Sequence, residues 1–188
     1  MKKILTLALS AVLMLSMVAC GGSTEKPDAQ ATEFTSALSV LEAAWGAMPE
    51  DQLFAAMGGD AENMVDGAPG AFGLADADVL DNMLGVPADS AALIDEAASL
   101  IHMMNANTFT AGAYHVADAA NTADFVSATQ ENIMGRQWMC GFPDTLIMVQ
   151  FGDSYVVSAF GNAELIESFK TQLTTLGGEV LAEESLAE

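Results

Sequence analysis

The sequence predicts an α+β domain built on a four-stranded antiparallel sheet, with additional N-terminal helices. Three observations support this prediction. First, the C-terminal half repeats the order strand, strand and helix, over residues 100–134 and again over residues 145–176. Second, a two-residue turn with glycine first joins the last two strands. Third, helical patterns fill the N-terminal half. Because helices in such folds gather over the sheet, we expect the helices of both units on one face of it.

A first helix is expected to begin at Thr35 and to end before Gly46. Leu38, Leu41 and Trp45 fall on one face of this helix, at the spacing of an amphipathic helix. The apolar face should pack the helix against the rest of the domain.

Two further helices are expected before the sheet begins. Pro49 opens the first and Gly58 ends it, in line with the preference for proline at the start of a helix and glycine after its end. Residues 58–73 are rich in Gly, Ala, Asp and Pro and are expected to form a loop. Asp76 starts the next helix at its positive end, and Gly85 stops it.

Four strands are expected, at residues 100–104, 108–117, 145–151 and 154–160. Asn121 and Asn162 each cap the helix that follows a pair of strands. The last helix carries the clearest apolar stripe in the chain, formed by Leu165, Ile166, Phe169, Leu173 and Leu176. Residues 146–150 do not alternate apolar and polar side chains, so both faces of this strand should be buried. The N-terminal helices or a partner subunit would cover the second face.

The first twenty residues form an export pattern. A positively charged start precedes an apolar run over residues 4–17, which is shorter than the roughly 20 residues needed to cross a bilayer. Val18, Ala19 and Cys20 close the pattern, and Met17 stands where leucine is usual. This arrangement resembles a bacterial lipoprotein signal, in which the cysteine thiol is diacylated and becomes the new N-terminus. The alternative is an ordinary secretory signal with a chance cysteine.

The chain is therefore expected to divide into four parts. These are a lipoprotein signal peptide over 1–19, a lipidated Cys20 with a flexible linker over 20–32, a single α+β domain over 33–178, and an acidic, frayed tail over 179–188. The domain would be exported and held on the outer face of the cell membrane by acyl chains on Cys20.

The acidic composition limits the classes of partner. The formal net charge is −21, and removal of Lys2 and Lys3 with the signal would leave three basic residues against 26 acidic ones, a charge of −23. Such a surface repels phosphate backbones, so nucleic acid is not expected as a partner. It also repels anionic lipid head groups, so contact with the bilayer should come from the acyl anchor alone.

Several short patterns resemble those of an uncharacterised lipoprotein family, the domain of unknown function 4358 family. They are the helix end at 83–86, the strand at 114–118, the helix start at 124–126, and the glycine turn and strand at 152–157. The likeness covers roughly residues 80–173 and departs from the family at Ala117 and Asp118, where a lysine is usual. The resemblance implies a fold and a surface location but no reaction.

A small set of side chains could carry chemistry. His102 and His115 fall on successive expected strands, and with Met103 and Cys140 they could form a soft-metal site for Cu(I). Met104, Met139 and Met148 could add ligands to this site. Cys140 could alternatively act as a nucleophile with a histidine base. The alternative is a purely structural role, in which these histidines and methionines, and Cys140, pack in the core or in loops.

The sequence gives no usable catalytic motif: an S-x-x-K string at residues 23–26 lies in the expected linker, without S-D-N or K-T-G elsewhere, and is interpreted as chance. The strings H-E-x-x-H, G-x-S-x-G, G-x-G-x-x-G and the Walker loop do not occur. The favoured function is therefore a non-enzymatic, lipid-anchored module without a cofactor, which binds an unidentified protein or small ligand. A soft-metal (copper) lipoprotein and a cysteine-dependent enzyme are the alternatives.

Overall fold

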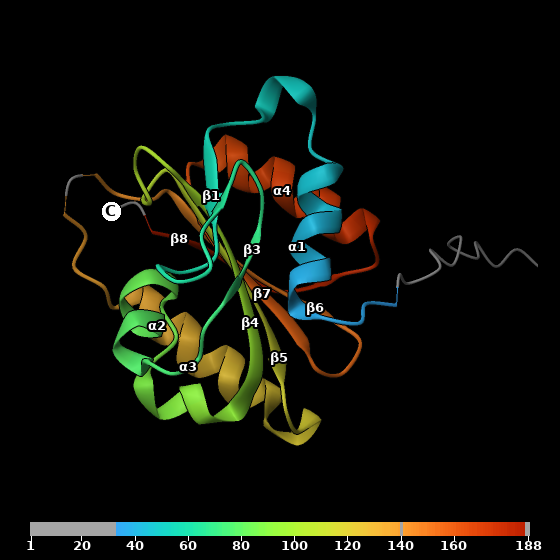
Figure 1. The fold of residues 1–188 in the computed structure, drawn as a ribbon, viewed down its shortest axis with the longest axis vertical. Coiled ribbons are helices and arrows are strands. Elements are labelled where there is room, and N and C mark those ends of the chain that lie inside the picture. Colours follow the sequence, from blue (N-terminus) through green and yellow to red (C-terminus); the bar gives the residue numbers. More distant parts are fainter. Residues whose placement is uncertain (1–32, 140, 187–188) are drawn as a thin grey trace, which may run out of the picture.

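One antiparallel sheet forms the centre of the molecule, and helices cover both of its faces (Figure 1). The computed structural model describes residues 33–139 and 141–186. The sheet has eight strands in the order β2-β1-β4-β5-β7-β6-β8, with β3 paired to β4. The strands are β1 Ala56–Gly58, β2 Val65–Asp66, β3 Gly70–Phe72, β4 Ile94–His102, β5 Phe109–Val116, β6 Thr145–Phe151, β7 Tyr155–Gly161 and β8 Glu179–Ser185. The helices are α1 Ala37–Gly46, α2 Ala77–Leu84, α3 Thr122–Met134 and α4 Ala163–Thr175, with short 3₁₀ helices η1 Glu50–Gln52, η2 Ala88–Leu93 and η3 Ala119–Asn121.

The prediction of a four-stranded sheet is wrong, because further strands extend the sheet at both edges. The four expected strands correspond to β4, β5, β6 and β7, which form its centre. β1, β2 and β3 form where the sequence indicated a helix and a loop, and β8 forms within the segment expected to be a frayed tail. The molecule belongs to the α+β class with an eight-stranded antiparallel sheet.

Glycine allows β1 and β3 to approach each other on the same side of β4. A Cβ at Gly58 would lie 2.2 Å from the backbone nitrogen of Gly70, and a Cβ at Gly70 would lie 2.6 Å from the backbone nitrogen of Gly59. Neither position can therefore carry a larger residue without moving the backbone. The helix expected from Pro49 is reduced to the single turn η1, and β1 follows it.

The last strand, β8, pairs antiparallel with β6 and forms one edge of the sheet. Lys170 of α4 donates hydrogen bonds of 2.9 and 3.0 Å to the Glu183 carboxylate of this strand. Acidic side chains on an edge strand repel the edges of other sheets, which is one way in which natural sheets avoid aggregation.

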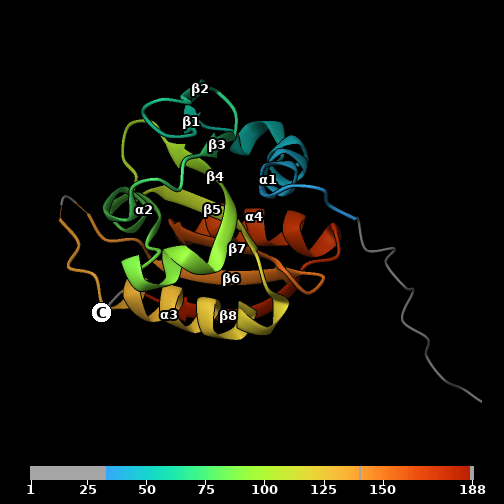
Figure 2. The same cartoon turned by 60° about the horizontal axis from the view of Figure 1, so that its bottom comes forward.

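The helices lie on opposite faces of the sheet, contrary to the expectation that those of the two units share one face (Figure 2). α1 and α4 pack on one face, where Leu41 and Phe169 are fully buried. α2 and α3 pack on the other face, where Leu84 and Phe125 are fully buried. No helix within the described residues is long and apolar enough to cross a membrane.

The central strand β6 explains this division. Its Ile147 and Val149 belong to the core beneath α1 and α4, whereas Leu146 and Met148 belong to the core beneath α3. All four side chains are fully buried, so both faces of the strand are covered, as its unbroken apolar run indicated. A strand of this kind requires a covering layer on each face, and helices supply both layers here.

The chain enters the domain at the end of the sheet that carries the β6–β7 turn. There the ring of Phe34 lies 5.0 Å from the ring of Phe151. The backbone N–H of Ala37, at the start of α1, donates a 2.9 Å hydrogen bond to the Glu96 carboxylate of β4. The β4–β5 turn lies at the other end of the same strands.

Candidate functional site

A polar pocket of about 420 Å³ lies at the end of the sheet that carries the β4–β5 turn. Its side chains come from α2, from the turn, and from the end of α3 with the residues after it. They are Asp81, Asn82, Asn107, Asn132, Arg136, Gln137, Trp138 and Met139. We refer to this group as the Arg136 pocket.

The end of α2 brings two of these segments together. Gly85 ends α2 in a left-handed conformation with a φ of 79°, and its N–H donates to the Asp81 carbonyl. A Cβ at Gly85 would lie 2.3 Å from Cγ1 of Ile133 on α3, so glycine is needed for this close approach of the two helices. The approach places Asp81 within hydrogen-bond reach of α3 and of the residues that follow it.

Hydrogen bonds fix the floor of the pocket. Oδ1 of Asp81 accepts from Nδ2 of Asn132 at 2.8 Å and from Nη2 of Arg136 at 3.2 Å. Nδ2 of Asn132 also donates to the Gly85 carbonyl at 3.0 Å. Asp81 therefore positions the guanidinium group of Arg136 instead of leaving it free in solvent.

Trp138 holds the guanidinium group from another side. Cζ of Arg136 lies 5.9 Å from the centre of the Trp138 ring, within the range of a cation–π contact. The Trp138 ring in turn packs 5.2 Å from the ring of Phe160. The Arg136 side chain is only 18% exposed; its burial lowers its pKa, whereas Asp81 acts in the opposite direction. The guanidinium group keeps its charge at neutral pH.

The pocket contains many hydrogen-bonding groups that have no partner within the described part of the chain. Arg136 uses one of its five N–H donors, in the bond to Asp81. The side chains of Asn82 and Gln137 and the indole N–H of Trp138 make no hydrogen bond to the described residues. These open donors and acceptors suit a small polar molecule that offers both kinds of group.

Asn107 connects the pocket to the loop after α3. Its Nδ2 donates to the carbonyls of Met139 and Gly141, at 3.0 and 2.9 Å. This link holds the β4–β5 turn beside the segment that carries Trp138. The pocket walls are therefore joined to one another by side-chain hydrogen bonds.

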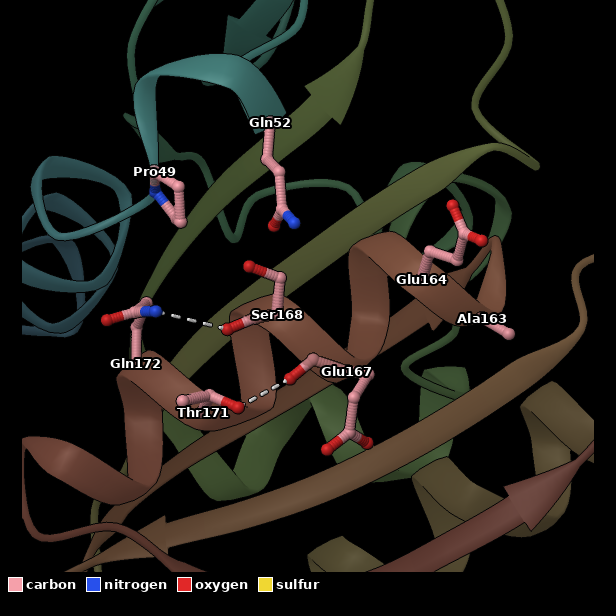
Figure 3. Close-up of a pocket in the computed structure, with 8 residues that line it drawn as sticks. All are labelled: Pro49, Gln52, Ala163, Glu164, Glu167, Ser168, Thr171 and Gln172. Carbon is pink, nitrogen blue, oxygen red and sulfur yellow. Dashed lines mark hydrogen bonds between the residues drawn. The ribbon is translucent and has the colours of Figure 1, made fainter.

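A wider hollow of about 590 Å³ lies between η1 and α4 (Figure 3). Figure 3 shows Gln52 pointing from η1 toward Ser168, while two of the α4 side chains bond to their own helix. Thr171 donates to the Glu167 carbonyl at 2.9 Å, and Gln172 donates to the Ser168 carbonyl at 3.5 Å. Its lining, as far as the structure describes it, has no cation and no aromatic ring, so it offers less specific recognition than the Arg136 pocket.

No family model matches the chain, and neither a curated protein nor a solved structure shows significant similarity to it. The resemblance to the domain of unknown function 4358 family therefore stays a prediction from short patterns. Any function must be argued from the geometry of the chain itself.

The two histidines of the predicted soft-metal site lie apart. His102 ends β4 and His115 lies near the far end of β5. The pairing of these strands separates them by about six residues along the sheet, or about 20 Å at 3.3 Å per residue. The hypothesis that both could serve one metal ion is wrong, because the strands run antiparallel and place the histidines at opposite ends.

Each histidine also has a partner of its own. Nδ1 of His102 accepts from the N–H groups of Met104 and Asn105, at 3.2 and 3.4 Å, and its ring stacks 5.1 Å from the ring of Phe54. A histidine that binds a metal normally donates through its other nitrogen, so this arrangement disfavours His102 as a ligand. Nδ1 of His115 lies 2.5 Å from Oδ1 of Asp95.

The other predicted ligands are scattered. Met103, Met104 and Met139 are exposed, and Met148 is fully buried in the core beneath α3. Met103 and Met104 line a hollow of about 290 Å³ beside His102. Within residues 33–139 and 141–186, no group of three or more His, Cys, Asp or Glu side chains could hold a metal ion. Cys20 and Cys140 lie outside the described residues.

The Arg136 pocket was not predicted from the sequence. Asp81 and Arg136 are 55 positions apart, and only the packing of α2 against α3 brings them together. One signal was nevertheless present: Arg136 is the only arginine of a strongly acidic chain, and a tryptophan follows it two residues later.

Proposed function

We propose that this chain is an exported, lipid-anchored module of the cell surface that binds a small polar ligand in the Arg136 pocket. The export pattern and Cys20 support the location. The hydrogen-bonding groups of the pocket that have no partner among the described residues support the binding activity. A non-enzymatic role is favoured because the lining residues that the structure describes include no histidine and no hydroxyl nucleophile.

One observation carries the binding proposal. Arg136 is largely buried, yet it makes a single hydrogen bond within the described residues. The open guanidinium nitrogens are not among the fully buried, unpartnered side-chain atoms of the described residues, so they are accessible from the pocket or from solvent. An accessible arginine that is held beside a tryptophan is a favourable recognition element. The volume of about 420 Å³ lies within the range of small-molecule sites.

The two tryptophans provide an internal test of ligand binding. Trp138 lines the pocket and its indole N–H has no partner among the described residues, whereas the indole N–H of Trp45 donates to the Gly67 carbonyl at 3.2 Å. The full chain, purified in detergent and labelled with ¹⁵N, would be titrated with a panel of sugars, amino acids and short peptides. We expect a panel member to shift the Trp138 signal and leave the Trp45 signal in place. A Trp138 signal that responds to no compound would contradict the proposal.

The anchor is tested separately in cells. Cys20→Ala should abolish the incorporation of labelled palmitate and release the protein from the membrane fraction. Cys140→Ala is the matched control, since it removes the other cysteine of the chain and should leave labelling unchanged. Labelling that survives Cys20→Ala would exclude this attachment.

A further inference from the structure

We infer that the Arg136 pocket selects ligands that carry a carboxylate, which would pair with the open side of the Arg136 guanidinium group. This inference rests on the proposed binding function and names the chemical class of the ligand. The shared chemistry is a singly charged carboxylate on a small molecule with further hydroxyl or amide groups. An acidic sugar and an amino acid or peptide C-terminus are the two sources.

The contact with Asp81 leaves room for a second carboxylate. Asp81 bonds to Nη2 of Arg136 through one oxygen, Oδ1, at 3.2 Å. A two-point pair between arginine and a carboxylate uses two parallel N–H bonds, which this contact does not form. Four guanidinium donors have no partner within the described residues, so a ligand carboxylate can form such a pair without displacing Asp81.

The guanidinium group is already held in place. Asp81 binds one nitrogen, the Trp138 ring lies 5.9 Å from Cζ, and the side chain is 18% exposed. A ligand that pairs with it therefore needs to order little of the protein, and the pair forms where water is partly excluded. Both conditions make a charged pair stronger than one on an open surface.

Arg136 is also the cation best suited to this role among the described residues. The other cation, Lys170, contacts Glu167 at 2.5 Å and Glu183 at 2.9 Å. Asp81 compensates part of the charge of Arg136, which favours a singly charged ligand over a phosphate monoester with nearly two charges. The amide side chains of Asn82 and Gln137 are then available for the uncharged groups of the ligand.

The test uses pairs of probes that differ only in the carboxylate. Glucuronate is compared with glucose, and N-acetyl-dialanine with its C-terminal amide, by titration of the full chain with the Trp138 N–H signal as the readout. We expect the acid of at least one pair to bind at least tenfold more tightly than its neutral partner. The pair that shows the preference tells whether the acidic sugar or the peptide carboxylate is the better source.

Variants locate the effect. Arg136→Gln should remove the preference for the acid, and Arg136→Lys, which keeps the charge opposite Asp81, should weaken acid binding severalfold because an ammonium cannot make the two-point pair. Lys170→Gln removes the same amount of charge elsewhere and should leave both affinities within twofold. Thermal unfolding of each variant shows that the domain is intact.

The outcomes separate this inference from the function on which it rests. Equal binding of both members of each pair, an acid preference that persists in Arg136→Gln, or tighter binding of glucose 6-phosphate than of the acids would overturn the carboxylate inference alone. A Trp138 signal that shifts only with neutral compounds would also overturn the carboxylate inference alone. A Trp138 signal that shifts with no compound would overturn both the carboxylate inference and the proposed binding function.

Discussion

The hydroxyl group of Tyr114 occupies the space in which a side chain of Gly112 would lie. Both residues point to the same face of β5, and a Cβ at Gly112 would be 2.1 Å from the hydroxyl oxygen. Tyr114 is fully buried, and its hydroxyl lies 3.1 Å from Oγ of Ser158 and 3.4 Å from the Leu84 carbonyl. Gly112 therefore makes room for a buried tyrosine that joins the sheet to the end of α2.

The first prediction concerns this glycine. Gly112→Ala should lower the free energy of unfolding by about 1–3 kcal/mol, because the ring of Tyr114 must leave its position to admit a methyl group. Gly46→Ala is the matched control, since a Cβ there meets no atom within 4 Å. Chemical denaturation of both variants would measure the difference. Equal stability of Gly112→Ala and the parent protein would show that the packing around Tyr114 is loose.

The second prediction concerns the dependence of stability on pH. Burial raises the pKa of Tyr114 above its ordinary value of 10.0, which means that the folded state resists ionisation there. The unfolded chain ionises this tyrosine at its ordinary pKa, so stability should be intact below pH 10 and fall as the pH rises beyond it. Lys170, whose pKa is raised chiefly by its hydrogen bond to Glu167, should add to the fall in the same direction.

Tyr114→Phe separates these contributions. The variant should lose about 1–2 kcal/mol at pH 7, because Oγ of Ser158 loses its partner, and should show a shallower fall of stability above pH 10. Urea denaturation at pH 7 and at about pH 11 would provide the comparison. A Tyr114→Phe variant that is as sensitive to alkali as the parent would assign the effect to other groups.

The third prediction tests the charge balance of the Arg136 pocket. Asp81→Asn keeps an oxygen that can accept from Arg136 but removes the competing negative charge. An acidic probe should then bind about threefold to tenfold more tightly, which corresponds to about 1 kcal/mol, while its neutral partner should bind as before. Titrations of glucuronate and glucose would measure this. A gain shared equally by both probes would indicate a change of shape rather than of charge.

The fourth prediction concerns the short strands β1 to β3. Asp60 accepts hydrogen bonds from the N–H groups of Glu62 and Asn63, at 2.8 and 2.9 Å, and from the N–H of Gly73. These hydrogen bonds lower the pKa of Asp60, and the bond from the Gly73 N–H has the largest effect. Their stabilising effect should be present above the ordinary pKa of 3.8 and be lost as the pH falls through the lowered value. Asp60→Ala should cost about 1 kcal/mol and speed amide exchange over residues 56–73.

Asp89→Ala is the control for this last change. Asp89 is exposed, and its side chain makes no hydrogen bond to the described residues. Amide exchange measured by mass spectrometry should therefore be unchanged in this variant. Unaltered exchange in Asp60→Ala would contradict the role given to the Asp60 carboxylate.

The sequence located the elements whose signals are local. β6, Thr145–Phe151, was predicted with both of its ends, because the loop at residues 141–144 precedes the apolar run and a glycine turn follows it. α4 begins after Asn162, whose side chain accepts from the N–H groups of Glu164 and Leu165, as expected for a capping residue. Short-range patterns of this kind need no knowledge of the rest of the chain.

What could not be predicted depends on contacts between distant segments. β2 has two residues, and β1 and β3 have three each, so no alternation could reveal them. β1 and β3 form strands by pairing with β4, and β2 forms one by pairing with β1. β8 was missed because its acidic side chains are typical of a solvated tail, although they also suit an edge strand. The Arg136 pocket likewise requires α2 and α3 to meet.

The place where the chain enters the domain has a consequence for the separation of its two proposed surfaces. Phe34 lies against Phe151 at the β6–β7 end of the sheet, and the Arg136 pocket lies beside the β4–β5 turn at the other end. The strands between them span about 23 Å, at 3.3 Å for each of the seven steps along β5. With Cys20 in the bilayer as proposed, the anchored segment would join the domain at one end of these strands and the ligand would bind at the other, so tethering and binding would use separate surfaces.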